Sequence, residues 1–133
     1  MTQQSPKTPP LLDPDEQPPY SRYNPDGQSG VVLVCDHARN ATPRSLAGLG
    51  LSSEILSTHI GLDIGCEHLS KKIADNLDSV LLIAGFSRLV VDLNRPPDHP
   101  TSIPVQSDGI DIPGNQSLSI KDCLLYTSDA ADE

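Results

Sequence analysis

Two short apolar runs and one amphipathic stripe dominate the hydrophobic pattern of the chain. Residues 30–35 (GVVLVC) and 80–84 (VLLIA) are almost wholly aliphatic, which is typical of strands that a parallel sheet buries on both faces. Between these runs, apolar side chains recur every three or four residues, which predicts a helix with one buried face. The stripe consists of Leu62, Cys66, Leu69, Ile73 and Leu77. Residues 88–93 (RLVVDL) predict a further strand, so the expected order of strand, helix, strand, strand indicates a layered α/β domain.

The two ends of the chain differ in composition from its centre. Residues 1–29 hold seven of the thirteen prolines and little to bury, so we expect a flexible arm that ends near the turn sequence NPDG at 24–27. Residues 94–115 carry further prolines and glycines without periodicity, which predicts a long loop. Residues 123–133 (CLLYTSDAADE) resemble the translated read-through of a sequencing-library adapter. We therefore expect a non-native tail, and a folded part at residues 30–122 that is the front portion of a larger domain.

Charge, hydropathy and cysteine content narrow the class of protein. The net charge of -9 and the pI of about 4.6 argue against a nucleic-acid-binding surface. The sequence has no signal-like start and no apolar stretch of membrane-spanning length, so we expect a cytoplasmic protein that does not bind membranes. Three cysteines without metal-ligand spacing argue against a disulfide framework and for a reducing compartment. Cys35 is expected to be a small buried thiol, because successive residues of a strand point to opposite faces and cannot form a thiol–imidazole pair.

The first candidate site residues follow the first predicted strand. Ligands of parallel α/β sheets bind beyond the carboxyl ends of strands, so His37 is a candidate metal ligand or general base. His59 and Asp63 stand four residues apart, and on one face of a helix they could contact the same ion. The structural alternatives are a surface histidine in a turn for His37 and a helix N-cap for Asp63.

A second group of candidates lies at the predicted strand 88–93. Asp92, Asn94 and Arg95 would stand at its carboxyl end, where the guanidinium of Arg95 could bind a carboxylate through two hydrogen bonds. Alternatively, Asp92 and Arg95 pair with each other. Arg88 begins this strand and is expected at the opposite end, although a loop could bring it back. If the strands are parallel and adjacent, His37 and Arg95 should lie at the same edge of the sheet.

Four motifs in one order resemble the N-formylglutamate amidohydrolase family, across roughly residues 24–118. They are VCDHARN at 34–40, HIGLDIG at 59–65, SRLVVDLNRP at 87–96 and IPGN at 112–115. The resemblance implies a three-layer α/β/α sandwich with a mostly parallel central sheet, similar to zinc carboxypeptidases and aspartoacylases. It also implies hydrolysis of N-formyl-L-glutamate to formate and glutamate, a reaction of bacterial histidine breakdown.

The same resemblance assigns roles to the candidate residues. His37 and Asp63 are implied ligands of a divalent metal ion, expected to be zinc. His59 and Asp92 are the candidate catalytic residues. The candidates for binding the carboxylate of a small-molecule substrate are Arg95, Asn94 and, with less support, Arg88.

Departures from the family pattern leave alternatives open. Related zinc peptidases have a metal-binding glutamate three residues after the histidine, where this chain has Asn40, and a later histidine motif of the family is missing. The chain could therefore be an inactive fragment, a non-catalytic carboxylate-binding module or a related deacylase of other N-acyl amino acids. About three strands with an unpaired edge are also expected to leave apolar surface exposed and to make the chain poorly soluble.

Overall fold

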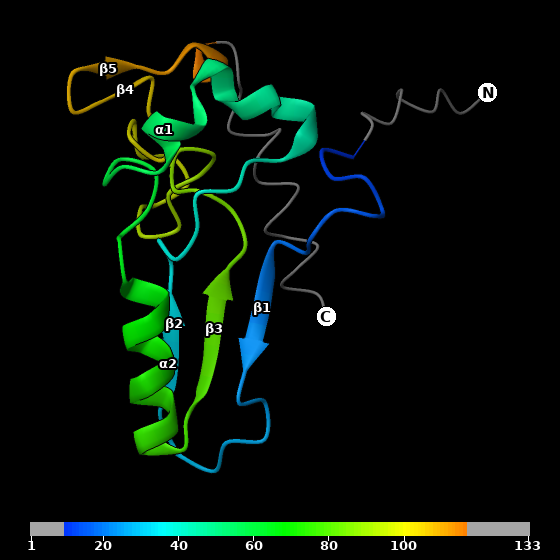
Figure 1. Cartoon of the computed structure of the whole chain (residues 1–133), viewed down its shortest axis with the longest axis vertical. Helices are drawn as coiled ribbons and strands as arrows, with labels where there is room; N and C mark the ends of the chain where they lie inside the picture. The colour runs from blue at the N-terminus through cyan, green and yellow to red at the C-terminus, as the bar shows by residue number, and fades with distance from the viewer. Residues whose placement is uncertain (1–9, 117–133) are drawn as a thin grey trace.

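The computed structural model describes residues 10–116 of the chain (Figure 1). Its strands are β1 (Tyr20–Tyr23), β2 (Val32–Cys35), β3 (Val80–Ala84), β4 (Gln106–Ser107) and β5 (Ile110–Asp111). Its helices are α1 (Ser53–Leu56), α2 (Cys66–Leu77) and two 3-10 helices at Arg44–Gly50 and Pro113–Asn115. The first three strands form a mixed sheet in the order β1-β3-β2, and β4 pairs with β5. The predicted α/β class is confirmed.

The central pair of strands follows the sequence prediction. β2 and β3 carry the two apolar runs and pair in parallel, from Val32 beside Val80 to Cys35 beside Ile83. β3 covers the predicted run of residues 80–84, and β2 covers the last part of the first run. The carboxyl ends of parallel strands lie at the same edge of a sheet, and His37 follows β2 at this edge.

β1 was not predicted, and its position corrects two expectations. It lies within the proline-rich segment but pairs antiparallel with β3, so these residues are part of the sheet and not of a flexible arm, and the sheet is mixed instead of mostly parallel. The Tyr23 hydroxyl donates to Asp75 of α2 at 2.9 Å, and the side-chain amide of Asn24 donates to the Ser79 carbonyl at 3.1 Å. Gly27 closes the predicted turn against the Asp78 carbonyl, where a Cβ would collide. These long-range contacts fix a strand that local composition does not indicate.

The predicted strand at residues 88–93 is wrong, because this segment is a turn followed by irregular chain. The Val90 amide donates to the Ser87 carbonyl at 3.0 Å, which bends the backbone directly after β3. Leu89 and Val90 are 1% and 4% exposed, and they pack into an apolar cluster outside the sheet. The apolar run is therefore buried by loop packing and not by strand pairing.

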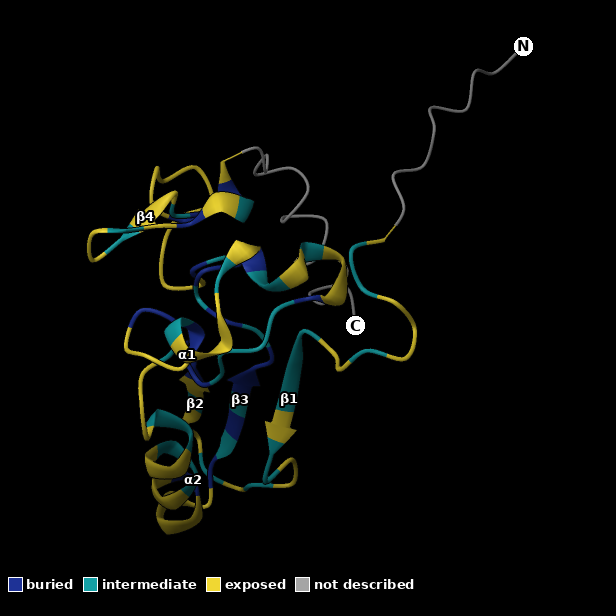
Figure 2. Cartoon of the chain, turned by 45° about the horizontal axis from the view of Figure 1, so that its top comes forward, coloured by how far each residue is buried: buried dark blue, intermediate teal, exposed yellow. Residues whose placement is uncertain are grey.

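Helix α2 forms as the periodicity predicts, but three of the five residues of the expected buried stripe, Leu69, Ile73 and Leu77, are exposed. Ala74 is instead fully buried against the sheet. Much of the α2 ribbon is coloured as exposed in Figure 2. The opposite face of the sheet is also open, since Val32 and Val34 are 59% and 63% exposed. Residues 10–116 therefore show a sheet with α2 on one face, and the three-layer sandwich stays a prediction.

Two apolar clusters hold the described residues together. One lies between the sheet and α2 and contains the buried Cys35, Ala38, Ala74, Leu81 and Ile83. The other lies among the loops and contains Leu49, Leu56, Ile60, Leu89, Val90 and Ile112. None of the helices within residues 10–116 has the length and apolar character that a membrane span requires.

Candidate functional site

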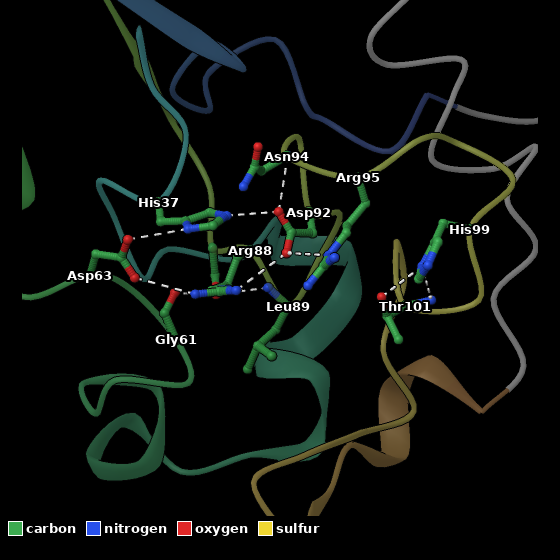
Figure 3. A network of polar contacts seen from close by, with 11 residues as sticks. His37, Gly61, Asp63, Arg88, Leu89, Asp92, Asn94, Arg95, His99 and Thr101 are labelled. Atoms are coloured by element: carbon green, nitrogen blue, oxygen red, sulfur yellow. Dashed lines mark hydrogen bonds and ion pairs between the residues drawn. The ribbon is translucent and has the colours of Figure 1, made fainter.

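A buried histidine stands at the centre of the polar network shown in Figure 3. The His37 side chain leaves the sheet just beyond the carboxyl end of β2, and the residue is only 8% exposed. Its Nδ1 lies 3.3 Å from Asp63 Oδ2, and its Nε2 lies 2.7 Å from Asp92 Oδ1. The His37 carbonyl also accepts a hydrogen bond from the Asp63 amide at 2.9 Å. The backbone and the side chain of Asp63 are thus both fixed to His37.

Asp92 is buried and held from several sides. Its backbone amide donates to the Ser102 carbonyl at 2.7 Å, and its Oδ1 accepts the Asn94 amide at 3.0 Å. Burial raises the pKa of this carboxyl group, but the hydrogen bonds from His37 and Asn94 outweigh burial, so the pKa lies below its ordinary value. Asp92 is therefore a buried anion that accepts a hydrogen bond from the His37 ring.

Arg88 lies between the two carboxylates that contact His37 (Figure 3). Its Nη1 is 3.2 Å from Asp63 Oδ1, and its Nη2 is 3.4 Å from Asp92 Oδ2. The expectation that Arg88 lies at the far end of a strand is wrong, because residues 88–90 form a turn that brings it back to Asp92. The Ser87 hydroxyl donates to the Gly61 carbonyl at 2.7 Å and fixes this turn against the segment that carries Asp63.

Asn94 and Arg95 lie at the open side of the same network. Arg95 Nε is 4.0 Å from Asp92 Oδ2, and the Arg95 side chain is 48% exposed. His37 and Arg95 thus approach opposite oxygens of one carboxylate, so the structure brings them together at one edge of the sheet. The Asn94 side chain is exposed, and Figure 3 shows the bond from Asn94 to Asp92 Oδ1. Both residues are accessible to a ligand.

His59 lies apart from this network. Its Nε2 is 2.9 Å from Asp108 Oδ2 in the turn between β4 and β5, and its side chain is 72% exposed. The argument that His59 and Asp63 share a helix face is wrong, because both lie between the end of α1 and the start of α2. The structure therefore brings Asp63 to His37 but does not bring His59 there.

The pair of His37 and Asp63 fits a divalent metal ion in donor chemistry and in spacing. An imidazole nitrogen and a carboxylate oxygen are both common zinc ligands, and two ligands of a tetrahedral zinc ion stand roughly 3.3–3.6 Å apart. The observed separation of His37 Nδ1 and Asp63 Oδ2 is 3.3 Å. Asp92 accepts from the other ring nitrogen, as carboxylates do behind metal-binding histidines. No group of three such ligands occurs within residues 10–116.

Two contacts beside His37 were missed by the sequence analysis. Residues 35, 37 and 39 span the turn at residues 36–37 and contact residues 66, 63 and 67 respectively. The Nε and Nη2 groups of Arg39 donate to the two carboxylate oxygens of Glu67, at 3.2 and 3.1 Å. The hydrogen bond from Arg39 lowers the pKa of Glu67 to about 2. Strand alternation does not indicate these contacts, since residues 36–37 form a turn and the buried Ala38 packs in the same cluster as Cys35.

Cys35 is a buried thiol, as predicted, with 2% of its surface exposed. Burial raises the pKa of this thiol to about 11, and the hydrogen bond with Cys66 adds to the effect. A thiol with this pKa is almost wholly protonated at neutral pH, which argues against Cys35 as the nucleophile that attacks a substrate amide.

Comparison with known proteins finds a matching family and a similar solved structure. The chain matches the N-formylglutamate amidohydrolase family over residues 29–130, a range that includes part of the segment 123–133 outside the described residues. Its sequence is 35% identical to that of gene product Atu2144 from Agrobacterium tumefaciens, and its fold matches the crystal structure of that protein with a TM-score of 0.81. The match covers 89% of this chain but only 47% of that one, so the chain spans about half the length of this relative. No curated protein matches the chain. With residues 29–130 matched by the family, the chain belongs to the N-formylglutamate amidohydrolase family.

Proposed function

We propose that this chain carries part of the active site of an enzyme that hydrolyses the amide bond of an N-formyl or N-acyl acidic amino acid, such as N-formyl-L-glutamate. Membership of the family supports the reaction class. The observation that carries the proposal is the buried His37 between Asp63 and Asp92, with the exposed Arg95 on the same side. This arrangement combines a candidate metal-binding pair with a cation for an acidic substrate.

In this proposal, His37 and Asp63 hold a divalent metal ion, for which zinc suits the nitrogen and oxygen ligands. The bound ion would polarise the amide carbonyl of the substrate and activate a water molecule for attack. Catalytic zinc sites use three protein ligands, so the third is expected from residues outside 10–116.

Asp92 acts as a positioning residue. Its carboxylate accepts the Nε2 proton of His37 at 2.7 Å, which fixes the tautomer and leaves the Nδ1 lone pair directed at Asp63. Arg88 holds the other oxygens of both carboxylates and so limits their rotation. The proposal gives His59 no catalytic role, because its ring contacts Asp108 at the surface.

Arg95 and Asn94 are proposed to bind the substrate carboxylate. The guanidinium of Arg95 is only loosely paired with Asp92 at 4.0 Å, so it can turn to a ligand without leaving a buried charge. A planar guanidinium binds a carboxylate through two parallel hydrogen bonds, which favours acidic amino acids over neutral ones.

The test is an assay of formate release by the complete product of the gene that encodes this chain. We expect turnover of N-formyl-L-glutamate that a chelator abolishes and zinc restores. His37→Ala should abolish metal binding and turnover, and Arg95→Ala should raise KM about tenfold or more, the equivalent of one charged hydrogen-bonded pair. Arg22→Ala, on the exposed side of β1, is the matched control and should leave KM unchanged. Metal-loaded protein that hydrolyses no formylated or acylated acidic amino acid would contradict the proposal.

A further inference from the structure

Two free cysteines face each other beside the candidate site. Cys35 ends β2 and Cys66 begins α2, and their Sγ atoms lie 3.0 Å apart although 31 positions separate them in the sequence. This separation is only about 1 Å longer than the S–S bond of a disulfide. A bond could therefore form with a small shift of the side chains.

The surrounding contacts keep the two thiols together. The Asp63 amide donates to the His37 carbonyl at 2.9 Å, and Arg39 pairs with Glu67 through two hydrogen bonds. These contacts flank the thiol pair on the same two segments. The local geometry thus presents the cysteines to each other at high effective concentration, which favours intramolecular over intermolecular pairing.

We propose that Cys35 and Cys66 are a redox-sensitive pair that closes into an intramolecular disulfide by exchange with a small-molecule disulfide such as glutathione disulfide. Cys66 attacks one sulfur of the oxidant, forms a mixed disulfide and releases one glutathione thiol. Cys35 then attacks the Cys66 sulfur and releases the second glutathione thiol. The protein loses two electrons and two protons, and the oxidant gains both as two thiols.

Accessibility assigns the first step to Cys66. Cys35 is only 2% exposed, whereas Cys66 is partly exposed at the start of α2. An open hollow of about 340 Å³ lies beside this helix start, and its lining includes Gly65 and Glu67, the two neighbours of Cys66. Lys71 and His68 also line it, and the Lys71 ammonium, which pairs with Glu67 at 2.9 Å, would exchange this partner for a carboxylate of a glutathione-like oxidant.

The proposed bond would join the two segments that carry His37 and Asp63. Cys35 lies two residues before His37, and Cys66 lies three residues after Asp63. Oxidation would therefore fix the spacing of these segments covalently, whatever reaction the site performs. The inference does not rest on the proposed function, since the bond can be detected without any assay of activity.

The test is disulfide mapping of the purified chain after equilibration in glutathione redox buffers. Trypsin should place Cys35 in the peptide 23–39, Cys66 in the peptide 45–71 and Cys123 in the peptide 122–133. We expect mass spectrometry of alkylated digests to find the first two peptides linked, and dithiothreitol to separate them. Half of the Cys35–Cys66 pair should be oxidised at a ratio of glutathione disulfide to the square of the glutathione concentration that is at least tenfold lower for the folded chain than for the same chain in urea.

Single variants separate the two steps. Cys35→Ser should stop at a glutathione adduct on Cys66, whereas Cys66→Ser should leave Cys35 unmodified in the folded protein. Three results would overturn the proposal: a stable glutathione adduct on Cys66 of the unmutated chain, pairing of either cysteine with Cys123, or equal oxidation of the folded and the urea-unfolded chain. The mapping itself needs no variant, so a variant that fails to fold leaves the test intact.

Discussion

The regular and the irregular regions of this molecule differ in how many of their large apolar side chains they bury. The sheet half, made of β1, β2, α2 and β3, has the more regular backbone but leaves many large apolar side chains in solvent. They are Val31, Val32, Val34, Leu69, Ile73 and Leu77, whereas the loop half exposes Ile64, Leu93 and Val105. The loop half, residues 36–65 and 85–116, has mostly turns and very short elements, yet it contains the larger aliphatic cluster. Regular secondary structure and good packing are therefore separate properties here.

The loop half compensates for its lack of backbone ladders with side-chain hydrogen bonds. The buried Asn115 amide donates to the carbonyls of Leu89 and Pro104, at 2.7 and 2.8 Å. The buried Ser87 hydroxyl likewise donates to Gly61. Buried carbonyls need such partners because the chain has left helix and sheet geometry. The polar network around His37 is thus held by a packed loop structure and not by the sheet alone.

The largest difference in stability between the two halves is expected when one leucine in each half is replaced by alanine. Leu89→Ala should lower the free energy of unfolding by about 2–4 kcal/mol, because Leu89 is 1% exposed and its removal leaves a cavity in the loop cluster. Leu69→Ala on α2 should change it by less than about 0.5 kcal/mol, because Leu69 is 60% exposed. Urea unfolding followed by circular dichroism measures both. Equal losses would mean that the α2 face is covered in solution.

The elements that the sequence predicted are those that local patterns determine. β2, β3 and α2 follow from aliphatic runs and from helical periodicity within a single segment. β1 depends on pairing with β3, some sixty residues away, and on the hydrogen bond of Tyr23 to Asp75, which no local pattern reveals. The run at 88–93 has the pattern of a strand, but tertiary packing of Leu89 and Val90 decides its conformation.

Proximity within the site was predicted in part. His37 and Arg95 meet through Asp92 as expected, but only the position of His37 follows from a strand end, because Arg95 lies in irregular chain and not at the end of a strand. Arg88 and His59 were placed wrongly because both placements assumed regular structure, a strand for one and a helix for the other. Turn geometry decides their positions, and it depends on contacts such as Ser87 with Gly61 that are distant in sequence.

The side-chain hydrogen bonds of the loop half give the next prediction. Asn115→Ala should cost about 1–3 kcal/mol of stability, because it leaves the buried carbonyls of Leu89 and Pro104 without their amide donor. Asn76 on α2 makes a similar bond to the Lys72 carbonyl, but it is exposed. Asn76→Ala should therefore be neutral or slightly stabilising, since alanine favours helices. Chemical unfolding compares the two variants, and a neutral Asn115→Ala would refute the role given to this bond.

A smaller effect is expected where the two halves join at Arg39 and Glu67. The pKa of Glu67 falls from 4.5 to about 2 on folding, so the ionised form stabilises the fold above pH 4.5 and this contribution is lost as the pH falls towards 2. Glu67→Gln should lower stability at pH 7 by about 1–2 kcal/mol, after allowance for the partial exposure of the pair. The difference from the unmutated chain should shrink below pH 4.5.

Urea unfolding of both proteins at several pH values between 7 and 3 tests this dependence. Glu54→Gln is the matched control, because Glu54 is an exposed glutamate in the first turn of α1. Its stability difference should be small at every pH. A difference for Glu67→Gln that stays constant down to pH 3 would contradict the assignment of the pH dependence to this pair.

The smallest change in stability is expected on the open face of the sheet. Val34 is 63% exposed on β2, so Val34→Thr should change the free energy of unfolding by less than about 0.5 kcal/mol while it raises solubility in ammonium sulfate precipitation. Val90→Thr is the matched change in the loop half, where the residue is 4% exposed, and it should cost at least about 1 kcal/mol because it buries a hydroxyl group. If Val34→Thr were as costly as Val90→Thr, the face would be covered in solution, and the contrast between the two halves would hold for residues 10–116 alone and not for the protein in solution.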